Sequence, residues 1–236
     1  MIFLTLFLLL IIVGYPVWDY FYLKKIKSNQ LNKWRMYGEI VITQWILVII
    51  FLVYWFLTKH TFNNLFSIKK PLFSLDKDFL LSAGVGAGIS IIMIVFMISF
   101  SKNAREKISE GLSDESIQFL LPSNFKERLF FLLVAVTAGV CEEIIFRGAM
   151  FHYFDHLPFH LSTVAIGIIS SLLFGIVHLY QGWKGVLFTS YLGGIMFFLL
   201  VGTGSLWVPI ALHFIIDSKF VFLPNKKRPS SVIKEN

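Results

Sequence analysis

Long apolar stretches recur along almost the whole chain, and they constrain the fold more than any other feature. Most of them reach the roughly 20 residues that an α-helix needs to cross the ~30 Å hydrocarbon core of a bilayer. They are residues 2–22, 38–57, 79–100, 129–150, 161–180, 185–201 and 206–223. The runs are continuous rather than alternating, which excludes a transmembrane β-barrel. The sequence therefore predicts an all-α, polytopic integral membrane helical bundle with about seven transmembrane helices, within a range of six to eight.

The whole chain, residues 1–236, is predicted to form a single membrane domain, because no linker is long enough to release a second one. The first apolar stretch lacks a basic segment before it and a small-residue cleavage site, so we interpret it as a retained span. The longest loop, residues 101–128, is either a short amphipathic helix on the membrane surface or a solvated connector. Residues 224–236 are predicted to be a polar cytoplasmic tail.

The net charge of +7 is distributed as a topology signal rather than as a nucleic-acid-binding surface. Most basic residues fall in alternate loops: Lys24, Lys25, Lys27, Lys33, Arg35, Lys102, Arg105, Lys107, Lys126, Arg128, Lys184, Lys226, Lys227, Arg228 and Lys234. Only Lys59, Lys69, Lys70 and Lys77 fall on the other side. For seven spans this asymmetry predicts an outside N-terminus and a cytoplasmic C-terminus, in a bacterial cell membrane, with the lipid bilayer and not nucleic acid as the partner.

Three charged residues, Glu142, Glu143 and Arg147, lie within six positions of one apolar stretch. Each charge at membrane depth costs about 2.5–3.5 kcal/mol on insertion scales, so such a cluster needs a compensating reason. Arg147 follows Glu143 by four residues, the favourable order for an ion pair on a helix. Glu142 points about 100° away from Glu143 and has no partner on its own helix, which suits a general base.

Two later apolar stretches each contribute a histidine. Phe174 precedes His178 by one helical turn, so its ring is expected to pack beside the imidazole. Asp217 follows His213 by one turn, where it could orient the imidazole or contact a substrate. Pro158 places a turn near residue 160, with Ser162 or Thr163 capping the next helix, and this turn would bring residues 142 and 178 level. His213 lies closer to its own turn, so tilt or a short broken helix must absorb the mismatch.

In chain order these residues read Glu-Glu-x-x-x-Arg, Phe-x-x-x-His and His-x-x-x-Asp. This ordered set resembles the CPBP group, which includes the type II CAAX prenyl endopeptidases and the bacterial Abi or bacteriocin-immunity proteins. The resemblance covers residues 130–222, and a catalytic core of this kind is expected over residues 128–223. It implies an intramembrane endopeptidase in which a glutamate and a histidine activate water.

Carried over motif by motif, the resemblance makes Glu142 the base and His178 its partner on the water. His213 and Asp217 would stabilise the oxyanion of the tetrahedral intermediate, with Glu143, Arg147 and Phe174 as supporting residues. The eukaryotic prenyl-protein members carry Asn where this chain has Asp217. An ionised Asp cannot donate a hydrogen bond to an oxyanion, so either Asp217 is protonated or it orients His213. This departure puts CAAX cleavage in doubt even where proteolysis is expected.

We expect no tightly bound cofactor. If a metal such as zinc is present, Glu142, His178 and His213 form the ligand set that such an ion uses in hydrolases. The expected partner is a membrane protein or a lipidated peptide, acting as substrate, and the sequence leaves the oligomeric state open. Two other functions remain at this stage: a non-catalytic scaffold or bacteriocin-immunity protein that uses the same residues to bind a partner, and a transporter. Replacing Glu142 by the isosteric Gln separates the first of these from a protease.

Overall fold

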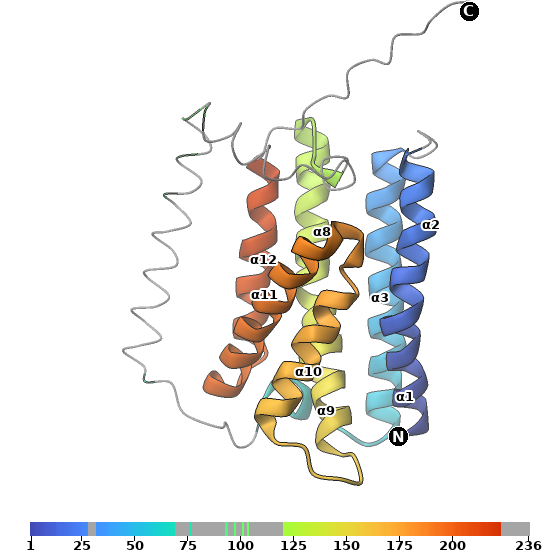
Figure 1. Ribbon diagram of the computed structural model, residues 1–236, viewed down its shortest axis with the longest axis vertical. Helices are drawn as coiled ribbons and strands as arrows, with labels where there is room; N and C mark the ends of the chain where they lie inside the picture. The colour runs from blue at the N-terminus through green and yellow to red at the C-terminus, as the bar shows by residue number, and fades with distance from the viewer. Residues whose placement is uncertain are drawn as a thin grey trace, which may run out of the picture.

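The computed structural model describes residues 1–27, 32–68 and 120–222, together with residues 76, 93, 97, 101 and 103. Regular structure within these residues is helical apart from one isolated bridge that pairs Ser67 with Ser205. The long helices run roughly side by side as an upright bundle (Figure 1). The predicted all-α class is therefore confirmed.

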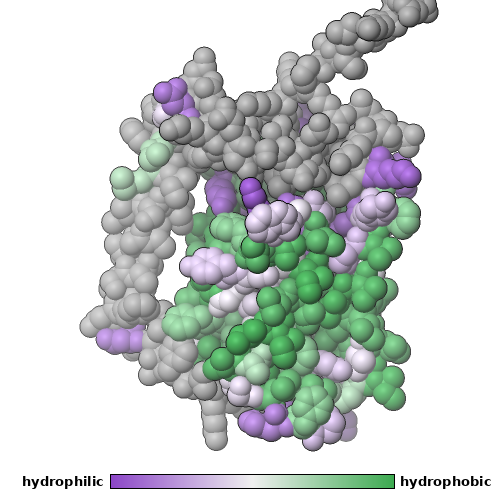
Figure 2. Space-filling model, viewed as in Figure 1, coloured by the Kyte–Doolittle hydropathy of each residue, from purple (hydrophilic) through white to green (hydrophobic). Residues whose placement is uncertain are grey.

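Four helices are long and apolar enough to cross a membrane within the described part of the chain. They cover Ile2–Tyr22, Lys33–Leu57, Phe125–Asp155 and Leu179–Thr203. The elements that build them are α1 (Ile2–Leu9), η1 (Leu10–Gly14), α2 (Tyr15–Lys27), α3 (Lys33–Leu57), α8 (Phe125–Glu143), η2 (Ile144–Ala149), α9 (Met150–Asp155), η3 (Leu179–Gln181) and α11 (Gly182–Thr203). Apolar residues cover much of the described surface between more polar ends in the view of Figure 2, as expected for a membrane helical bundle.

Two of the predicted spans are shorter than expected. α10 (Thr163–Ile176) has 14 residues and α12 (Trp207–Ser218) has 12, followed by the single turn η4 (Lys219–Phe222). At 1.5 Å per residue α10 is about 21 Å long, less than the hydrocarbon thickness of a bilayer. The prediction of a membrane-spanning helix over residues 161–180 is therefore wrong in extent. The predicted span 79–100, most of the loop 101–128 and the tail 224–236 lie outside the described residues.

The starts of the long helices follow local capping chemistry. The side chains of Asn32, Asn124 and Ser162 each accept a hydrogen bond from a backbone N–H in the first turn of α3, α8 and α10, respectively. Each of these bonds satisfies a donor that the helix itself cannot pair. The predicted turn near residue 160 and the cap at Ser162 are confirmed, since α9 ends at Asp155 and α10 begins at Thr163.

Glycines set the closest helix contacts around the centre of the bundle. A Cβ placed at Gly139 of α8 would lie 3.0 Å from the backbone N of Phe214 in α12. A Cβ at Gly175 of α10 would lie 2.6 Å from the backbone O of Val186 in α11. Small residues are how membrane helices reach such separations. α8 is thereby held directly against α12, and α10 against α11.

The longest helical rod changes its winding in the middle. α8 ends at Glu143, and the next six residues form the π-helical turn η2 before α9 continues the rod. All six residues of η2 are buried, including Arg147. Wide turns of this kind are rare and frequently occur at functional sites. Here the turn begins directly after the two adjacent glutamates.

Candidate active site

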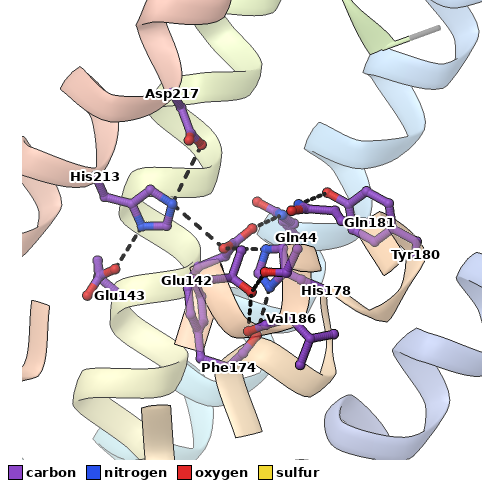
Figure 3. Close-up of polar contacts among 12 residues, drawn as sticks. Gln44, Glu142, Glu143, Phe174, His178, Tyr180, Gln181, Val186, His213 and Asp217 are labelled. Carbon is purple, nitrogen blue, oxygen red and sulfur yellow. Dashed lines mark hydrogen bonds and ion pairs between the residues drawn. The ribbon is translucent and has the colours of Figure 1, made fainter. Parts of the chain in front are cut away.

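The two adjacent glutamates point to different parts of the structure. Glu143 is fully buried and contacts Arg147 and His213. Glu142 is partly exposed and faces Gln44 and His178. This divergence follows from the ~100° rotation between neighbouring helix residues. Figure 3 shows both side chains leaving the same helix in different directions.

One carboxylate oxygen of Glu143 contacts both Arg147 and His213. Its Oε1 accepts a hydrogen bond of 3.1 Å from Arg147 Nη1 and lies 2.7 Å from His213 Nδ1. Arg147 also donates through Nη2 to the backbone oxygen of Gly193 in α11, and its guanidinium lies 4.4 Å from the centroid of the Phe174 ring. The predicted Glu143–Arg147 pair is present. It ties α8 and η2 to α10, α11 and α12.

Glu142 keeps one oxygen without a hydrogen bond. Gln44 Nε2, from α3, donates to Glu142 Oε1 at 2.9 Å. Glu142 Oε2 is buried, has no hydrogen-bond partner, and lies 3.7 Å from His178 Nε2 and 3.8 Å from His213 Nε2. These separations exceed a direct hydrogen bond but allow one water to bridge the atoms. The three residues predicted to act together are therefore brought together.

The sequence suggested that His178 lies within a helix. In the structure it lies beyond the end of α10. α10 ends at Ile176, Val177 is its C-cap, and His178 precedes the short turn η3. The backbone N–H of His178 bonds to Gly175 O, so the Phe174 oxygen receives the imidazole Nδ1 instead, at 2.7 Å. A carbonyl oxygen can only accept, so Nδ1 carries the hydrogen, and Nε2 of the neutral ring is an acceptor.

The predicted packing of Phe174 against His178 is present, with ring centroids 4.7 Å apart. Phe174 also meets the His213 ring edge-on, at 6.0 Å between centroids. One buried aromatic ring therefore touches both imidazoles and the Arg147 guanidinium. Its position limits the rotation of both histidines, and its supporting role in catalysis stays a prediction.

His213 is held at both ring nitrogens. Since Glu143 is ion-paired and accepts at 2.7 Å, His213 Nδ1 carries a hydrogen. Nε2 lies 3.5 Å from Asp217 Oδ2, one turn further along α12 (Figure 3). Carboxylates on both sides favour the doubly protonated, charged ring. In that form Nε2–H points to the space between Asp217 and Glu142.

The site opens into a cavity of about 130 Å³ lined by α2, α3, α8, η2 and η3. Its lining residues include Tyr15, Trp18, Asp19, Tyr22, Gln44, Glu142, His178 and Tyr180. Within residues 1–27, 32–68 and 120–222, no three His, Cys, Asp or Glu side chains are arranged as a metal-binding group. The donor types of Glu142, His178 and His213 still match those of a zinc hydrolase. The expectation that no metal is tightly bound therefore stays a prediction.

The sequence missed the contribution of the N-terminal helices to this site. Gln44 and Asp19 lie within apolar spans and were visible as intramembrane polar residues, but no motif links them to Glu142. Gln44 is 7% exposed and donates directly to the glutamate. A polar residue at membrane depth is by default a candidate for function, and this was the available signal.

Comparison with known proteins matches residues 124–218 to the family described as type II CAAX prenyl endopeptidase Rce1-like. All seven predicted site residues fall within this matched region. The chain is 28% identical over 145 residues to "Putative membrane peptidase YdiL" of Bacillus subtilis (strain 168). That alignment covers 58% of this chain and 57% of the relative, so it spans little more than half of either protein. No solved structure matches the chain.

Proposed function

We propose that this protein is an intramembrane endopeptidase, because residues 124–218 match the family described as type II CAAX prenyl endopeptidase Rce1-like. The observation that carries the proposal is the unpaired oxygen Oε2 of Glu142, which lies between the Nε2 atoms of His178 and His213. A buried acceptor without a donor costs about 1–3 kcal/mol, so a bound water that donates to it would be stabilising. That water is the proposed nucleophile.

The hydrogen-bond pattern suits activation of this water. Glu142 Oε2 and the neutral His178 Nε2 are both acceptors, so a water between them donates both of its hydrogens. Its lone pairs are then free to attack the carbonyl carbon of the substrate. As the new C–O bond forms, Glu142 takes one proton from the water and acts as the general base. The same proton passes to the leaving amine when the C–N bond breaks, which restores the carboxylate.

His213 is the proposed donor to the oxyanion. Its Nε2 atom lies 3.8 Å from Glu142 Oε2, on the same side of the site. A positioned donor at an oxyanion contributes about 2.7–4 kcal/mol to the barrier reduction in known cases. Asp217 cannot donate when ionised, so its role in this proposal is to orient and neutralise His213. Glu143 does the same from the other nitrogen.

The proposed substrate is a membrane-associated protein, either membrane-inserted or lipidated, cut near its C-terminus or its juxtamembrane segment. The proposed topology keeps the N-terminus outside and the C-terminus in the cytoplasm, in a bacterial cell membrane. CAAX cleavage itself is left open, because Asp217 replaces the Asn of the prenyl-protein members. The position of the site between apolar helices supports a membrane-associated substrate.

The proposed reaction needs no metal, since Glu142 and His178 are sufficient to polarise water. Purified protein dialysed against a strong chelator is expected to keep its cleavage rate. Loss of cleavage that zinc restores would overturn the metal-free mechanism. It would instead make Glu142, His178 and His213 the ligands of a metal-activated water.

The deciding experiment compares protein C-termini and membrane-protein fragments, by mass spectrometry, between cells carrying the wild type and cells carrying Glu142→Gln. Glutamine keeps the shape of the side chain but cannot accept a proton, so cleavage is expected to vanish while the fold is kept. His156→Gln, at the far end of the bundle, is the matched control and should give the wild-type profile. Identical profiles for wild type and Glu142→Gln, with both proteins folded, would leave a partner-binding scaffold as the function.

A further inference from the structure

The cavity beside Glu142 contains an acidic residue that the proposed mechanism does not use. Asp19 lies on α2, within the first membrane-spanning helix, and lines the same cavity as Glu142 and His178. Asp19 makes no hydrogen bond or ion pair with any other described residue. A carboxylate at membrane depth is energetically costly, so an unpaired one is a candidate for a function.

Aromatic residues surround Asp19 on the same face of α2. Tyr15, Trp18 and Tyr22 follow the i, i+3, i+7 spacing of one helix face, and all three line the cavity. Their rings contact one another, with centroids 5.8 Å apart for Tyr15 and Trp18 and 5.4 Å apart for Trp18 and Tyr22. Tyr180 adds a further ring from η3.

The winding of the first rod precedes this face. Pro16 has no backbone N–H to give to the carbonyl one turn earlier, and the preceding residues Leu10–Gly14 form a π-helical turn. α2 begins at Tyr15, and its first charged side chain is Asp19. The aromatic and acidic residues therefore begin directly after a break in regular helical winding.

The cavity is rich in acceptors that lack donors. Gln44 is 7% exposed, and its Oε1 is buried without a hydrogen-bond partner. The Asp19 carboxylate adds two more acceptor oxygens. A ligand that satisfies these atoms must bring hydrogen-bond donors, and the negative charge favours a cation. Aromatic faces also attract cations, most strongly the indole of tryptophan.

We propose that Asp19, Trp18 and the neighbouring tyrosines form a specificity subsite that binds a lysine or arginine side chain of the substrate, close to the bond that is cut. This inference rests on the proposed function and names a feature of its substrate. Membrane proteins carry an excess of lysine and arginine next to the cytoplasmic ends of their spans, which gives such residues to a protease at that depth. The cavity volume of about 130 Å³ is near the ~150 Å³ that holds one benzene. It fits one basic side chain.

The test uses the full-length protein in nanodiscs of zwitterionic phosphatidylcholine. The probe is a pool of short synthetic peptides without acidic residues, in which each position carries either lysine or its uncharged isostere norleucine. Mass spectrometry measures which peptides are retained by immobilised protein and, separately, which are cleaved. Five proteins are compared: wild type, Asp19→Asn, Asp19→Glu, Asp155→Asn and Glu142→Gln. Asp155→Asn makes the same chemical change at an exposed carboxylate outside the cavity.

The wild type is expected to retain lysine peptides about tenfold better than norleucine peptides at one position relative to the cut, as for a desolvated cation–aromatic contact with a counter-charge. Asp19→Asn should reduce that preference to less than about threefold. Asp19→Glu should restore the preference. Asp155→Asn should behave as the wild type does. Thermal unfolding of each variant in the same nanodiscs confirms that it is folded.

The outcomes separate this inference from the proposed function. Cleavage by the wild type without preference for lysine, or with a preference that Asp19→Asn keeps, overturns the subsite and leaves the protease. Retention of lysine peptides that depends on Asp19, without cleavage above the level of Glu142→Gln, supports the cation site and overturns the protease. Absence of both retention and cleavage contradicts both proposals.

Discussion

Two histidine-containing clusters in the same bundle have opposite surroundings. In the Glu142 cluster, formed by Glu142, Glu143, His178, His213 and Asp217, the imidazoles lie near carboxylates. In the Trp55 cluster, formed by Trp55, His60, His152 and His156, they lie against rings. His60 stacks on Trp55 at 4.4 Å, and His152 lies 4.8 Å from Trp55 and 4.1 Å from His156.

The difference is one of partners rather than of residue type. His156 Nδ1 lies 3.9 Å from the carboxylate of Asp155, and both side chains are more than half exposed. Its Nδ1 bonds to the backbone oxygen of His152 at 2.9 Å. By contrast, His213 is buried between two carboxylates and faces the unpaired oxygen of Glu142. A histidine becomes a candidate for catalysis when its second nitrogen faces a group that has no other partner.

The largest contrast is expected in activity. His178→Gln should lower cleavage of the identified substrate by about 10²–10⁴-fold, since it removes a group that polarises the water. The equivalent change in the Trp55 cluster, His152→Gln, should leave the rate within about twofold, because it lies outside the site. Initial rates measured on purified proteins decide this. Comparable losses in both variants would end the distinction between the clusters.

Stability should separate buried from exposed charge pairs of identical spacing. Arg147→Met leaves Glu143 buried without its cation and should cost about 3–5 kcal/mol of unfolding free energy. Arg35 and Glu39 form the same i,i+4 pair at 2.7 Å, but Arg35 is 75% exposed. Arg35→Met should therefore have little effect on the free energy of unfolding. Denaturant unfolding in matched detergent measures both, and equal losses would contradict the structural role of Arg147.

A helix contact near the Glu142 cluster should tolerate an added methyl group less well than a helix contact elsewhere in the bundle. Gly139→Ala places a methyl group 3.0 Å from the Phe214 backbone N, and such overpacking should cost about 1–3 kcal/mol. It should also lower cleavage, since it moves α12 and hence His213 away from α8. Gly38→Ala meets only one side-chain atom at 4.0 Å and should be neutral or stabilising by up to about 1 kcal/mol. Thermal unfolding and cleavage rates of the two variants test the pair.

The smallest effect on cleavage is expected for a substitution within the Trp55 cluster itself. Trp55→Phe loses the hydrogen bond of 3.0 Å from the indole Nε1 to the Thr61 backbone oxygen. It should cost about 1–3 kcal/mol of stability, because the smaller ring also leaves a cavity at this buried position, and it should leave cleavage unchanged. A clear drop in cleavage without unfolding would show that the two clusters are coupled through α8, η2 and α9.

The site could be predicted from the sequence further than the fold could. The Glu143–Arg147 spacing and the Phe174–His178 spacing are local, so one helical turn predicts both contacts. The end of α10 at Ile176 was missed, because residues 161–180 remain apolar through that point and hydropathy does not report where a helix stops. The π-helical turn after Glu143 was missed for the same reason. Gln44 was missed because its partner Glu142 lies 98 residues further along the chain. Asp19 was missed because only the fold brings it to the same cavity as Glu142, and a single sequence gives no information on that proximity.

The way α10 ends has a consequence for inhibitor chemistry. The tightened last turn leaves the Phe174 oxygen to the His178 imidazole, so both atoms that face the water position, His178 Nε2 and Glu142 Oε2, are acceptors. A compound whose central group only accepts hydrogen bonds would meet two acceptors and bind weakly there. A hydrated ketone presents two hydroxyl donors on one tetrahedral carbon and matches both atoms at once. Ketone-based peptide analogues are therefore the compounds expected to select this site.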